Sequence, residues 1–331
     1  MPDTQQAHHA TSTSTVPLVV DLDGTLTPTD TLVESALLLA KQNPLTLVKL
    51  PFWLLRGRES MKSEIARRVT INPEELPYRE DLLDYLRLER AKGRELVLAT
   101  AAHRAIAEGV AGHLGLFDRV LATDETRNLK GPNKLAAIRE EVGTQFAYAG
   151  DSAADLPVWE GAQAAVLVGA SNAVARTVRA RHPVEREFAQ PAPGLAVWRK
   201  ALRMHQWAKN LLLFVPMLTA FSFLPGDLAV MALAFLCFSL AASATYIAND
   251  LWDLGNDRKH PRKRLRPFAS GALPITAGVA AALLLLGTSF ALAFLVKPAF
   301  AAMLLAYVVL TTAYSWSLKE RVLVDVLVLS L

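Results

Sequence analysis

The sequence has little cysteine and no apolar segment at its start. Its single cysteine, Cys237, excludes an intramolecular disulfide and a zinc site made of several cysteines. Because Cys237 lies within an apolar run, we expect a small buried side chain. Residues 1–15 are polar and lack the apolar region of a secretory signal peptide, so we expect a disordered tail.

The sequence also lacks a large excess of either charge, since the net charge is only +4 over 331 residues. The basic residues gather beside apolar runs, which indicates a membrane surface as partner and no nucleic acid. Apolar residues make up 52% of the chain but are unevenly spread. Residues 1–206 resemble an ordinary soluble protein and residues 207–331 carry long apolar runs, so we predict at least two domains.

Short apolar runs alternate with helical patterns between residues 16 and 188. The runs are 16–20, 95–100, 119–123, 145–150 and 164–168. This alternation predicts an α/β domain with a parallel, doubly wound, Rossmann-like sheet, whose ligands bind at the carboxyl ends of the strands. A helical insert at about 27–92 follows the first strand and is long enough to act as a lid or cap.

Residues 189–206 are expected to connect the two domains. The three prolines of Pro183 to Pro193 predict a linker, and Leu195–Arg203 predicts a helix that lies at a membrane interface. Four apolar runs and the start of a fifth follow, at 207–224, 228–248, 273–296, 298–317 and 322–331. Since a span needs roughly 20 apolar residues, residues 207–331 predict an all-α transmembrane bundle.

Basic residues alternate between the loops of this bundle. They are dense before the first run, between the second and third runs, and after the fourth, and sparse in the other loops. The positive-inside rule therefore predicts a multi-pass protein of the inner (cytoplasmic) membrane. It also places the N-terminal domain and the charged loop after residue 248 on the cytoplasmic side.

Carboxylates follow two of the predicted strands. Asp21-Leu-Asp-Gly-Thr places Asp21 where it can attack a phosphoryl group and Asp23 where it can act as general acid and base. Gly150-Asp-Ser-Ala-Ala-Asp places Asp151 and Asp155 after another strand. A phosphate dianion would be repelled by these groups unless a cation is present, and oxygen ligands of this kind suit Mg²⁺.

Two further side chains complete this pattern. Thr100 ends a strand and offers a hydroxyl to a phosphate, and Lys134 begins a helix and can stabilise charge on phosphoryl oxygens. Lys130 competes with Lys134 for that role, and we favour Lys134. His103 could contact a substrate or could equally cap a helix.

The four elements in this order resemble the haloacid dehalogenase (HAD) superfamily of phosphatases, over about residues 16–187. The helical insert resembles the small cap of its phosphoserine-phosphatase-like branch. The resemblance implies that Asp21 is the nucleophile and Asp23 the acid and base. It also implies that Asp151 is a magnesium ligand, and Asp155 a ligand or a carboxylate next to the ligands.

A second set of carboxylates lies between two apolar runs. Asn249, Asp250, Asp253 and Asp257 have the spacing NDxxDxxxD, which would place the three aspartates on one face of a helix. Carboxylates at a membrane boundary are costly unless they are paired or bind a cation, so we predict that they hold Mg²⁺ and a pyrophosphate. Basic side chains that could hold more phosphate oxygens follow: Arg258, His260, Lys263, Arg264 and Arg266.

This stretch resembles the first aspartate-rich motif of the UbiA superfamily of intramembrane prenyltransferases. The fuller pattern NDxxDxxxDRxHPxKRxRPxASG is most similar to its phosphoribosyl branch, the decaprenyl-phosphate phosphoribosyltransferases. The resemblance implies that Asn249 and the three aspartates bind Mg-pyrophosphate, with Lys209 and Arg266 on phosphate. It also implies phosphoribosyl pyrophosphate and a polyprenyl phosphate or pyrophosphate as substrates, with an aromatic acceptor and a prenyl pyrophosphate as the alternative.

Members of the UbiA superfamily have more spans and a second aspartate-rich motif. We therefore expect a partial UbiA fold, cut within its fifth span. The favoured function is a membrane-bound enzyme with a transferase half and a magnesium-dependent phosphatase half. The alternatives are a membrane-anchored phosphatase with an inactive half transferase, and a HAD domain that only regulates or supports the transferase.

Overall fold

The computed structural model describes residues 16–124, 127–190, 193–221 and 223–316. Contacts divide the chain into two compact units. The first comprises residues 1–26, 57–66 and 78–190, and the second comprises residues 27–56, 67–77 and 191–331. The insert at about 27–92 is thereby divided, because two of its segments join the second unit and the rest joins the first.

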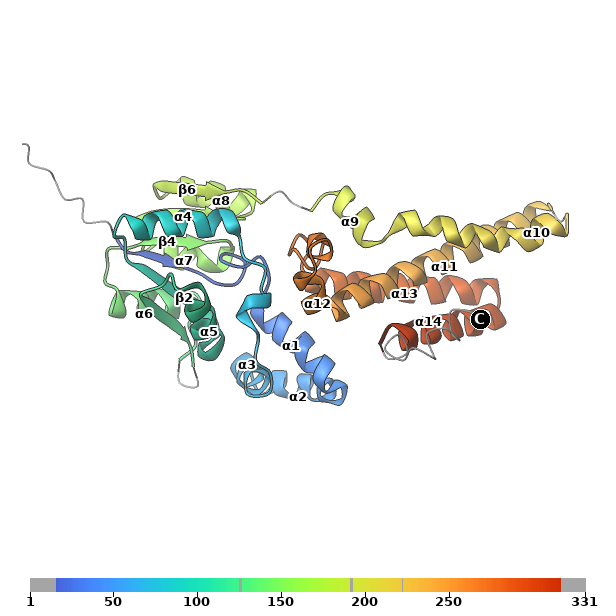
Figure 1. The fold of residues 1–331 in the computed structure, drawn as a ribbon, viewed down its shortest axis with the longest axis horizontal. Coiled ribbons are helices and arrows are strands. Elements are labelled where there is room, and N and C mark those ends of the chain that lie inside the picture. Colours follow the sequence, from blue (N-terminus) through green and yellow to red (C-terminus); the bar gives the residue numbers. More distant parts are fainter. Residues whose placement is uncertain (1–15, 125–126, 191–192, 222, 317–331) are drawn as a thin grey trace, which may run out of the picture. The chain divides into compact units, whose positions relative to one another are not determined.

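The first unit is built on a six-stranded sheet whose paired strands are all parallel (Figure 1). The strands are β1 (Leu18–Val20), β2 (Leu96–His103), β3 (Arg119–Thr123), β4 (Ala147–Gly150), β5 (Ala164–Val168) and β6 (Val184–Phe188). Their order in the sheet is β3-β2-β1-β4-β5-β6. The predicted doubly wound α/β fold is confirmed, with β1 in the middle and β2 and β4 on either side of it.

Strand β6 lies where the prolines predict a linker, so that prediction is wrong for Val184–Phe188. Three charged residues in a row, 185–187, are exposed along this strand and hide the alternation expected of a sheet. An edge strand tolerates such residues because only one of its sides pairs. Pro183 immediately precedes the strand, where a missing N–H costs nothing, and its carbonyl accepts from the Ala165 amide.

Helices α4 (Glu80–Ala91), α5 (Arg104–Leu114), α6 (Pro132–Glu141), α7 (Leu156–Trp159) and α8 (Asn172–Arg179) connect or flank the strands. One core cluster joins residues of β1, β2, β4 and β5 to Ile138 of α6, Trp159 of α7 and Val178 of α8. All of these side chains are at most 1% exposed. Burial of this apolar surface, worth about 25 cal/mol per Å², keeps the strand ends in place and so supports a site built on them.

The insert carries α1 (Thr31–Gln42), the 3₁₀ helix η1 (Pro44–Lys49), α2 (Leu50–Leu55), α3 (Arg58–Ala66) and η2 (Pro73–Glu75). Asp30 caps α1, since its carboxylate accepts from the amides of Leu32 and Val33. Val33 and Leu37 of α1 pack against a core cluster of the second unit that includes Leu251 and Ile275.

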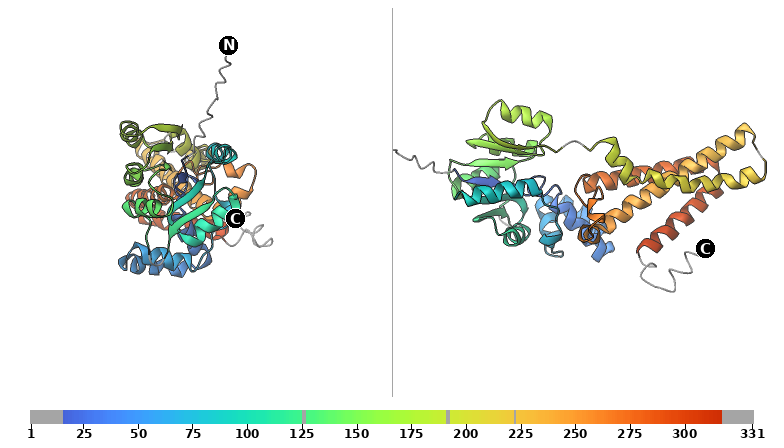
Figure 2. Two further views of the ribbon diagram at one scale, coloured as in Figure 1. Left: turned by 90° about the vertical axis from the view of Figure 1, so that its left-hand side faces the viewer. Right: turned by 45° about the horizontal axis from the view of Figure 1, so that its top comes forward.

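The rest of the second unit is helical. Its elements are α9 (Leu195–Ala201), η4 (Met204–Phe214), α10 (Val215–Thr219), α11 (Pro225–Trp252), α12 (Leu254–Lys259), η5 (Lys263–Leu265), α13 (Ile275–Val296) and α14 (Pro298–Trp316). Helices α11 and α13 lie side by side (Figure 2). Cys237 is buried in the core cluster shared by α11, α13 and α14, which confirms its predicted role as a small apolar side chain.

Two of the predicted spans, α11 and α13, are long and apolar enough to cross a membrane within the described part of the chain. The run at 207–224 is instead divided into η4 and α10, because Pro216 starts a new helix where its missing N–H is tolerated. Helix α14 is apolar over Pro298–Ala313 and continues to Trp316, where the described residues end. The run at 322–331 lies outside the described residues.

Candidate functional site

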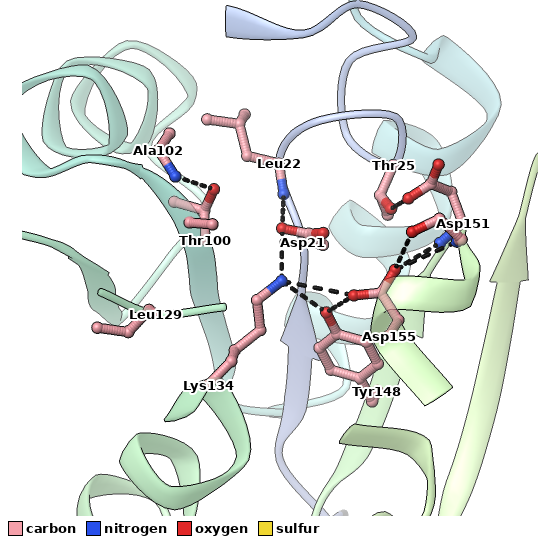
Figure 3. A network of polar contacts seen from close by, with 12 residues as sticks. Asp21, Leu22, Thr25, Thr100, Ala102, Leu129, Lys134, Tyr148, Asp151 and Asp155 are labelled. Atoms are coloured by element: carbon pink, nitrogen blue, oxygen red, sulfur yellow. Dashed lines mark hydrogen bonds and ion pairs between the residues drawn. The ribbon is translucent and has the colours of Figure 1, made fainter. Parts of the chain in front are cut away.

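Three polar side chains of the first unit meet because their strands are neighbours in the sheet. Asp21 directly follows β1, Thr100 lies near the end of β2, and Asp151 directly follows β4 (Figure 3). Parallel strands present their carboxyl ends at one edge, so residues 21, 100 and 151 converge there despite their distance in sequence. The predicted location of the site therefore corresponds to the one in the structure.

The loop after β1 is shaped around Gly24. Its φ of +79° lies in the region that favours glycine, and an added Cβ would approach the Asp151 Oδ2 to 2.3 Å. The Asp21 amide donates to the Ala149 carbonyl at 3.0 Å, and its carboxylate accepts from the Leu22 amide at 2.8 Å. The tight turn thus brings the Asp21 and Asp151 carboxylates to one place.

Lys134 of α6 supplies the cation of this site. Its Nζ lies 3.0 Å from the Asp21 Oδ1 and 3.5 Å from the Asp155 Oδ1, and its side chain is buried. Lys130 is exposed on the segment before α6. The structure therefore places Lys134 beside the predicted nucleophile Asp21, whereas Lys130 is exposed to solvent.

Asp155 is held by more hydrogen bonds than a simple metal ligand needs. Its Oδ1 accepts from the Tyr148 hydroxyl at 2.7 Å, and its Oδ2 accepts from the amides of Asp151 and Ser152 at 3.3 and 3.2 Å. Only 2% of Asp155 is exposed. Of the two roles expected for it, these contacts favour the one of a carboxylate that orients Lys134 and the Asp151 loop.

Tyr148 is a site residue that the sequence analysis missed. Its hydroxyl accepts from Lys134 Nζ at 3.0 Å and donates to Asp155, so it connects the two charges. Burial and the neighbouring carboxylates raise its pKa far above the usual range, which keeps it a neutral donor. The only sign of this role in the sequence is a tyrosine in strand β4, whose other residues are alanine and glycine.

The carboxylates repel one another in this buried setting. Burial raises the pKa of Asp21 to about 6, with Lys134 opposing the shift and Asp155 adding to it. Burial also raises the pKa of Asp151 to about 7, helped by the charges of Asp155 and Asp21. The pKa of Lys134 is raised by the same carboxylates although burial alone would lower it. One lysine does not balance three acids, so a further cation is favoured here.

The geometry of the acids fits a divalent cation. Asp21, Asp151 and Asp155 each offer a carboxylate oxygen, and these oxygens lie within 4.8 Å of one another. An all-oxygen donor set of this kind is what Mg²⁺ prefers in proteins. Asp23, predicted with the metal ligands, is half-buried on the loop and does not belong to this group.

The remaining predicted side chains of the first unit are also placed. Thr100 is fully buried, and its hydroxyl oxygen accepts from the Ala102 amide at 3.0 Å. His103 caps α5, because its Nδ1 accepts from the Ala105 amide at 3.3 Å. Of the two roles weighed for His103, the structure therefore supports the helix cap.

Arg79, which the sequence analysis also missed, supports the loop after β1. Its Nη2 donates to the Gly24 carbonyl at 3.0 Å and also contacts Gln190, while its amide donates to the Leu26 carbonyl at 3.1 Å. Burial lowers the pKa of Arg79, and the charge of Asp151 opposes that shift. A single arginine before a helix gives no signal of this role in the sequence.

The second predicted site has a different geometry from the one expected. Helix α11 ends at Trp252 and α12 begins at Leu254, so Asp253 lies at a break between two helices. Asp250 and Asp257 nevertheless approach the same place, because the Arg266 Nη1 lies 3.1 Å from the Asp250 Oδ1 and 2.6 Å from the Asp257 Oδ2. Among the described residues these aspartates do not form a group with metal-ligand spacing.

Two arginine side chains, Arg203 and Arg266, contact the aspartates of this second site. Arg203, before η4, also contacts Asp250, and its guanidinium lies 4.8 Å from the centre of the Tyr246 ring. The Asp257 Oδ1 is buried without a hydrogen-bond partner in the described chain. The Lys263 Nζ is 4.0 Å from this oxygen, which is an ion-pair distance and too long for a hydrogen bond.

Arg258, which the sequence predicts to hold phosphate, forms a buried ion pair in the structure. Its Nη1 and Nη2 donate to Glu34 of α1 at 3.1 and 2.6 Å, and its Nε donates to the Ala269 carbonyl at 3.1 Å. Both side chains of this pair are under 10% exposed. These contacts use three of the five N–H donors of the Arg258 guanidinium within the protein.

The other predicted binding residues of the second unit are more accessible. Lys209, His260, Lys263 and Arg264 are exposed, and Asn249 is half-buried on α11. The His260 Nδ1 accepts from the amides of Arg262 and Lys263 at 3.2 and 3.4 Å, which makes it a local cap. The Lys263 Nζ lies 4.0 Å from Asp257. Lys263 is thus the exposed base that lies beside an aspartate of the motif.

Two family models match the chain. Residues 18–160 match a haloacid dehalogenase-like hydrolase, and residues 211–331 match the UbiA prenyltransferase family. Uncharacterized protein y4nM of Sinorhizobium fredii is 41% identical over 320 residues, which are 95% of this chain and 61% of that protein.

Decaprenyl-phosphate phosphoribosyltransferase of Mycobacterium tuberculosis is 38% identical over 148 residues, which are 42% of this chain and 48% of that enzyme. A HAD family hydrolase of Salmonella enterica serovar Typhi is 17% identical, with a TM-score of 0.38 over 52% of this chain and 68% of that one. The chain thus covers less than two thirds of the curated relatives described here. Its first domain belongs to the haloacid dehalogenase-like hydrolases, and its second belongs to the UbiA prenyltransferase family.

Proposed function

We propose that the chain is a bifunctional membrane enzyme, a magnesium-dependent phosphatase joined to a transferase of phosphoribosyl groups. The observation that carries the phosphatase half is the buried contact between Asp21 and Lys134 at the edge where Asp151 also lies. A nucleophilic carboxylate with a lysine and further acids at strand ends is suited to phosphoryl transfer.

The proposed hydrolysis has two steps. A carboxylate oxygen of Asp21 attacks phosphorus, the ester P–O bond breaks, and Asp23 gives a proton to the leaving oxygen. Asp23 then takes a proton from a water whose oxygen attacks the same phosphorus. The bond to Asp21 breaks, inorganic phosphate leaves, and both carboxylates return to their starting state.

The neighbouring side chains support these steps by charge and position. Lys134 neutralises charge on the phosphoryl oxygens and, through Tyr148, stays oriented by Asp155. The Thr100 hydroxyl offers a donor to a phosphoryl oxygen. Asp21 and Asp151 would hold Mg²⁺, which supplies the charge that lets an anionic substrate approach the acids.

For the second half, we propose transfer of a phosphoribosyl group from phosphoribosyl pyrophosphate to a polyprenyl phosphate. The convergence of Asp250, Asp257 and Arg266 at one place supports a pyrophosphate site there. The match to decaprenyl-phosphate phosphoribosyltransferases across this region supports the substrate class. Lys263, which lies 4.0 Å from Asp257, and the exposed Arg264 can bind phosphate oxygens.

The two activities fit together chemically. A lipid that receives a 5-phosphoribosyl group carries a phosphate monoester, which is the class of bond that a HAD phosphatase hydrolyses. This arrangement requires both sites on one side of the inner membrane, which the distribution of basic residues favours.

The test of this function uses the full chain in detergent micelles. Release of phosphate from p-nitrophenyl phosphate should require Mg²⁺ and stop when EDTA is added. Radiolabel from phosphoribosyl pyrophosphate should enter the organic phase when polyprenyl phosphate is supplied. Phosphatase turnover without label transfer would support the anchored phosphatase instead, and no turnover in either assay would refute the proposal.

Lys134→Ala should reduce phosphatase turnover by about 100-fold or more, because the phosphoryl oxygens lose a buried positive charge. Lys130→Ala is the matched control and should leave turnover unchanged, since Lys130 is exposed. Initial rates of phosphate release at saturating Mg²⁺ measure both. Equal losses in the two variants, or a loss in Lys130→Ala alone, would contradict the assignment of Lys134.

Asp257→Asn should reduce label transfer to lipid by about 10- to 100-fold, the size of loss seen when a side chain that positions a binding group is changed. Asparagine keeps the shape of the aspartate side chain at position 257, but its contact with Arg266 is no longer an ion pair. Phosphatase turnover serves as an internal control and should not change. Asp227→Asn, an exposed aspartate near the start of α11, should behave like wild type in both assays.

A further inference from the structure

The insert carries a strongly apolar surface on η1 and α2. Five large apolar side chains between residues 45 and 55 are between 49% and 87% exposed: Leu45, Val48, Phe52, Leu54 and Leu55. N-terminal to residue 195, the described chain has one other large apolar residue of comparable exposure, Leu88. In the chain before residue 195, exposed apolar surface is therefore concentrated on this segment, and a concentrated patch of this kind marks an interaction surface.

Four of these side chains share one side of the segment. Leu45, Val48, Phe52 and Leu55 follow one another at spacings of three, four and three residues, which is the repeat of one helical face. Trp53, between them, points the other way and is only 5% exposed. One side of the segment is thus buried against its own unit through Trp53, and the other side exposes apolar side chains.

Basic side chains border this apolar face. Lys49 and Arg56 are both exposed, and the Arg56 guanidinium lies 4.5 Å from the centre of the Phe52 ring. Apolar side chains rimmed by lysine and arginine fit an anionic lipid surface, where the basic groups meet phosphates and the apolar groups enter the acyl boundary.

The segment also belongs to the unit that contains the long apolar helices. Residues 27–56 cluster with residues 191–331, and α1, immediately before η1, packs its Val33 and Leu37 against the core that includes Leu251 of α11 and Ile275 of α13. Because α11 and α13 are long enough to cross a membrane, a surface tied to their unit is within reach of the bilayer.

We propose that η1 and α2 form an interfacial membrane-contact surface. Leu45, Val48, Phe52 and Leu55 lie at the boundary between lipid headgroups and acyl chains, and Lys49 and Arg56 bind lipid phosphates. The HAD insert thereby has a bilayer contact of its own, separate from the spanning helices. Such a contact would hold the insert beside the membrane where a lipid phosphate ester is presented.

The single cysteine of the chain makes this testable in the full protein. Cys237 is replaced by alanine, and Val48→Cys or Leu55→Cys is labelled with an environment-sensitive NBD fluorophore. Leu88→Cys is the matched control, since Leu88 is 62% exposed and lies on α4 of the first unit. Each labelled chain is reconstituted in vesicles of phosphatidylcholine and phosphatidylglycerol, with and without doxyl-labelled lipids.

Doxyl lipids should quench the probes at residues 48 and 55 at least several-fold more than the probe at residue 88. In the double variant Lys49→Glu and Arg56→Glu, with Leu55→Cys as its probe site, quenching should weaken in vesicles that contain phosphatidylglycerol. Equal quenching at all three sites, or none, would overturn the proposal. A blue-shifted probe that doxyl lipids do not quench would also overturn it, because a protein surface and not lipid would then cover the face.

Discussion

Asp21→Asn should lower the Mg²⁺-dependent phosphatase activity of the full chain by about a thousandfold or more, a loss typical of removing a nucleophile. An amide nitrogen or oxygen in place of the carboxylate attacks phosphorus far less readily, while the shape of the side chain is kept. The Lys134 Nζ also loses the ionic partner that now lies 3.0 Å away. Initial rates with p-nitrophenyl phosphate measure the effect.

A control is needed because Asp21 is buried and paired with Lys134. Thermal unfolding of Asp21→Asn followed by tryptophan fluorescence separates lost chemistry from lost folding. Asp84→Asn, an exposed aspartate on α4, should match wild type in both rate and unfolding temperature. Wild-type turnover by a folded Asp21→Asn protein would rule out the carboxylate as nucleophile.

Glu34→Ala should destabilise the second unit by about 3–5 kcal/mol, the usual cost of leaving one partner of a buried ion pair alone. The Arg258 guanidinium would lose two of its three acceptors and keep only the Ala269 carbonyl. Thr29, whose hydroxyl donates to the Glu34 Oε1 at 2.7 Å, would lose its acceptor as well. The unfolding temperature in detergent is the measurement.

Two further variants separate the ion pair from general damage. Glu34→Leu with Arg258→Met removes both charges and should recover most of the lost stability, because no buried charge is left unpaired. Lys259→Ala breaks the more exposed contact with Glu75 and should leave the unfolding temperature unchanged. If the double variant is no more stable than Glu34→Ala, the bridge is not the cause of the loss.

The sequence alone indicated which residues of the first unit would come together at the ends of the strands. Asp21, Thr100 and Asp151 each follow or end a short apolar run, and a parallel sheet brings such strand ends together whatever their separation in sequence. The choice of Lys134 over Lys130 depends on a helix start after Pro132, which is a local signal. The fold and these positions could be predicted because they follow from local sequence patterns and from the rule that parallel strands end at the same edge of the sheet.

The contacts of the second unit could not be predicted in this way. Arg258 and Arg266 belong to the same basic stretch, yet one pairs with Glu34, 224 residues earlier, and the other joins Asp250 to Asp257. Charge and spacing are similar for both, and only the tertiary packing of α1 and α11 decides their partners. Strand β6 was missed for a related reason, since its charged residues are tolerated only at the edge of a sheet.

The proposed phosphatase mechanism requires that Asp21 becomes phosphorylated during turnover. The full chain is mixed with Mg²⁺ and radiolabelled acetyl phosphate, whose leaving group needs little protonation, and is then quenched in acid within milliseconds to seconds. We expect a label that is stable in acid, is released by hydroxylamine, and maps to the peptide that contains Asp21. Wild-type turnover with no such label, or a label that persists in Asp21→Asn, would contradict it.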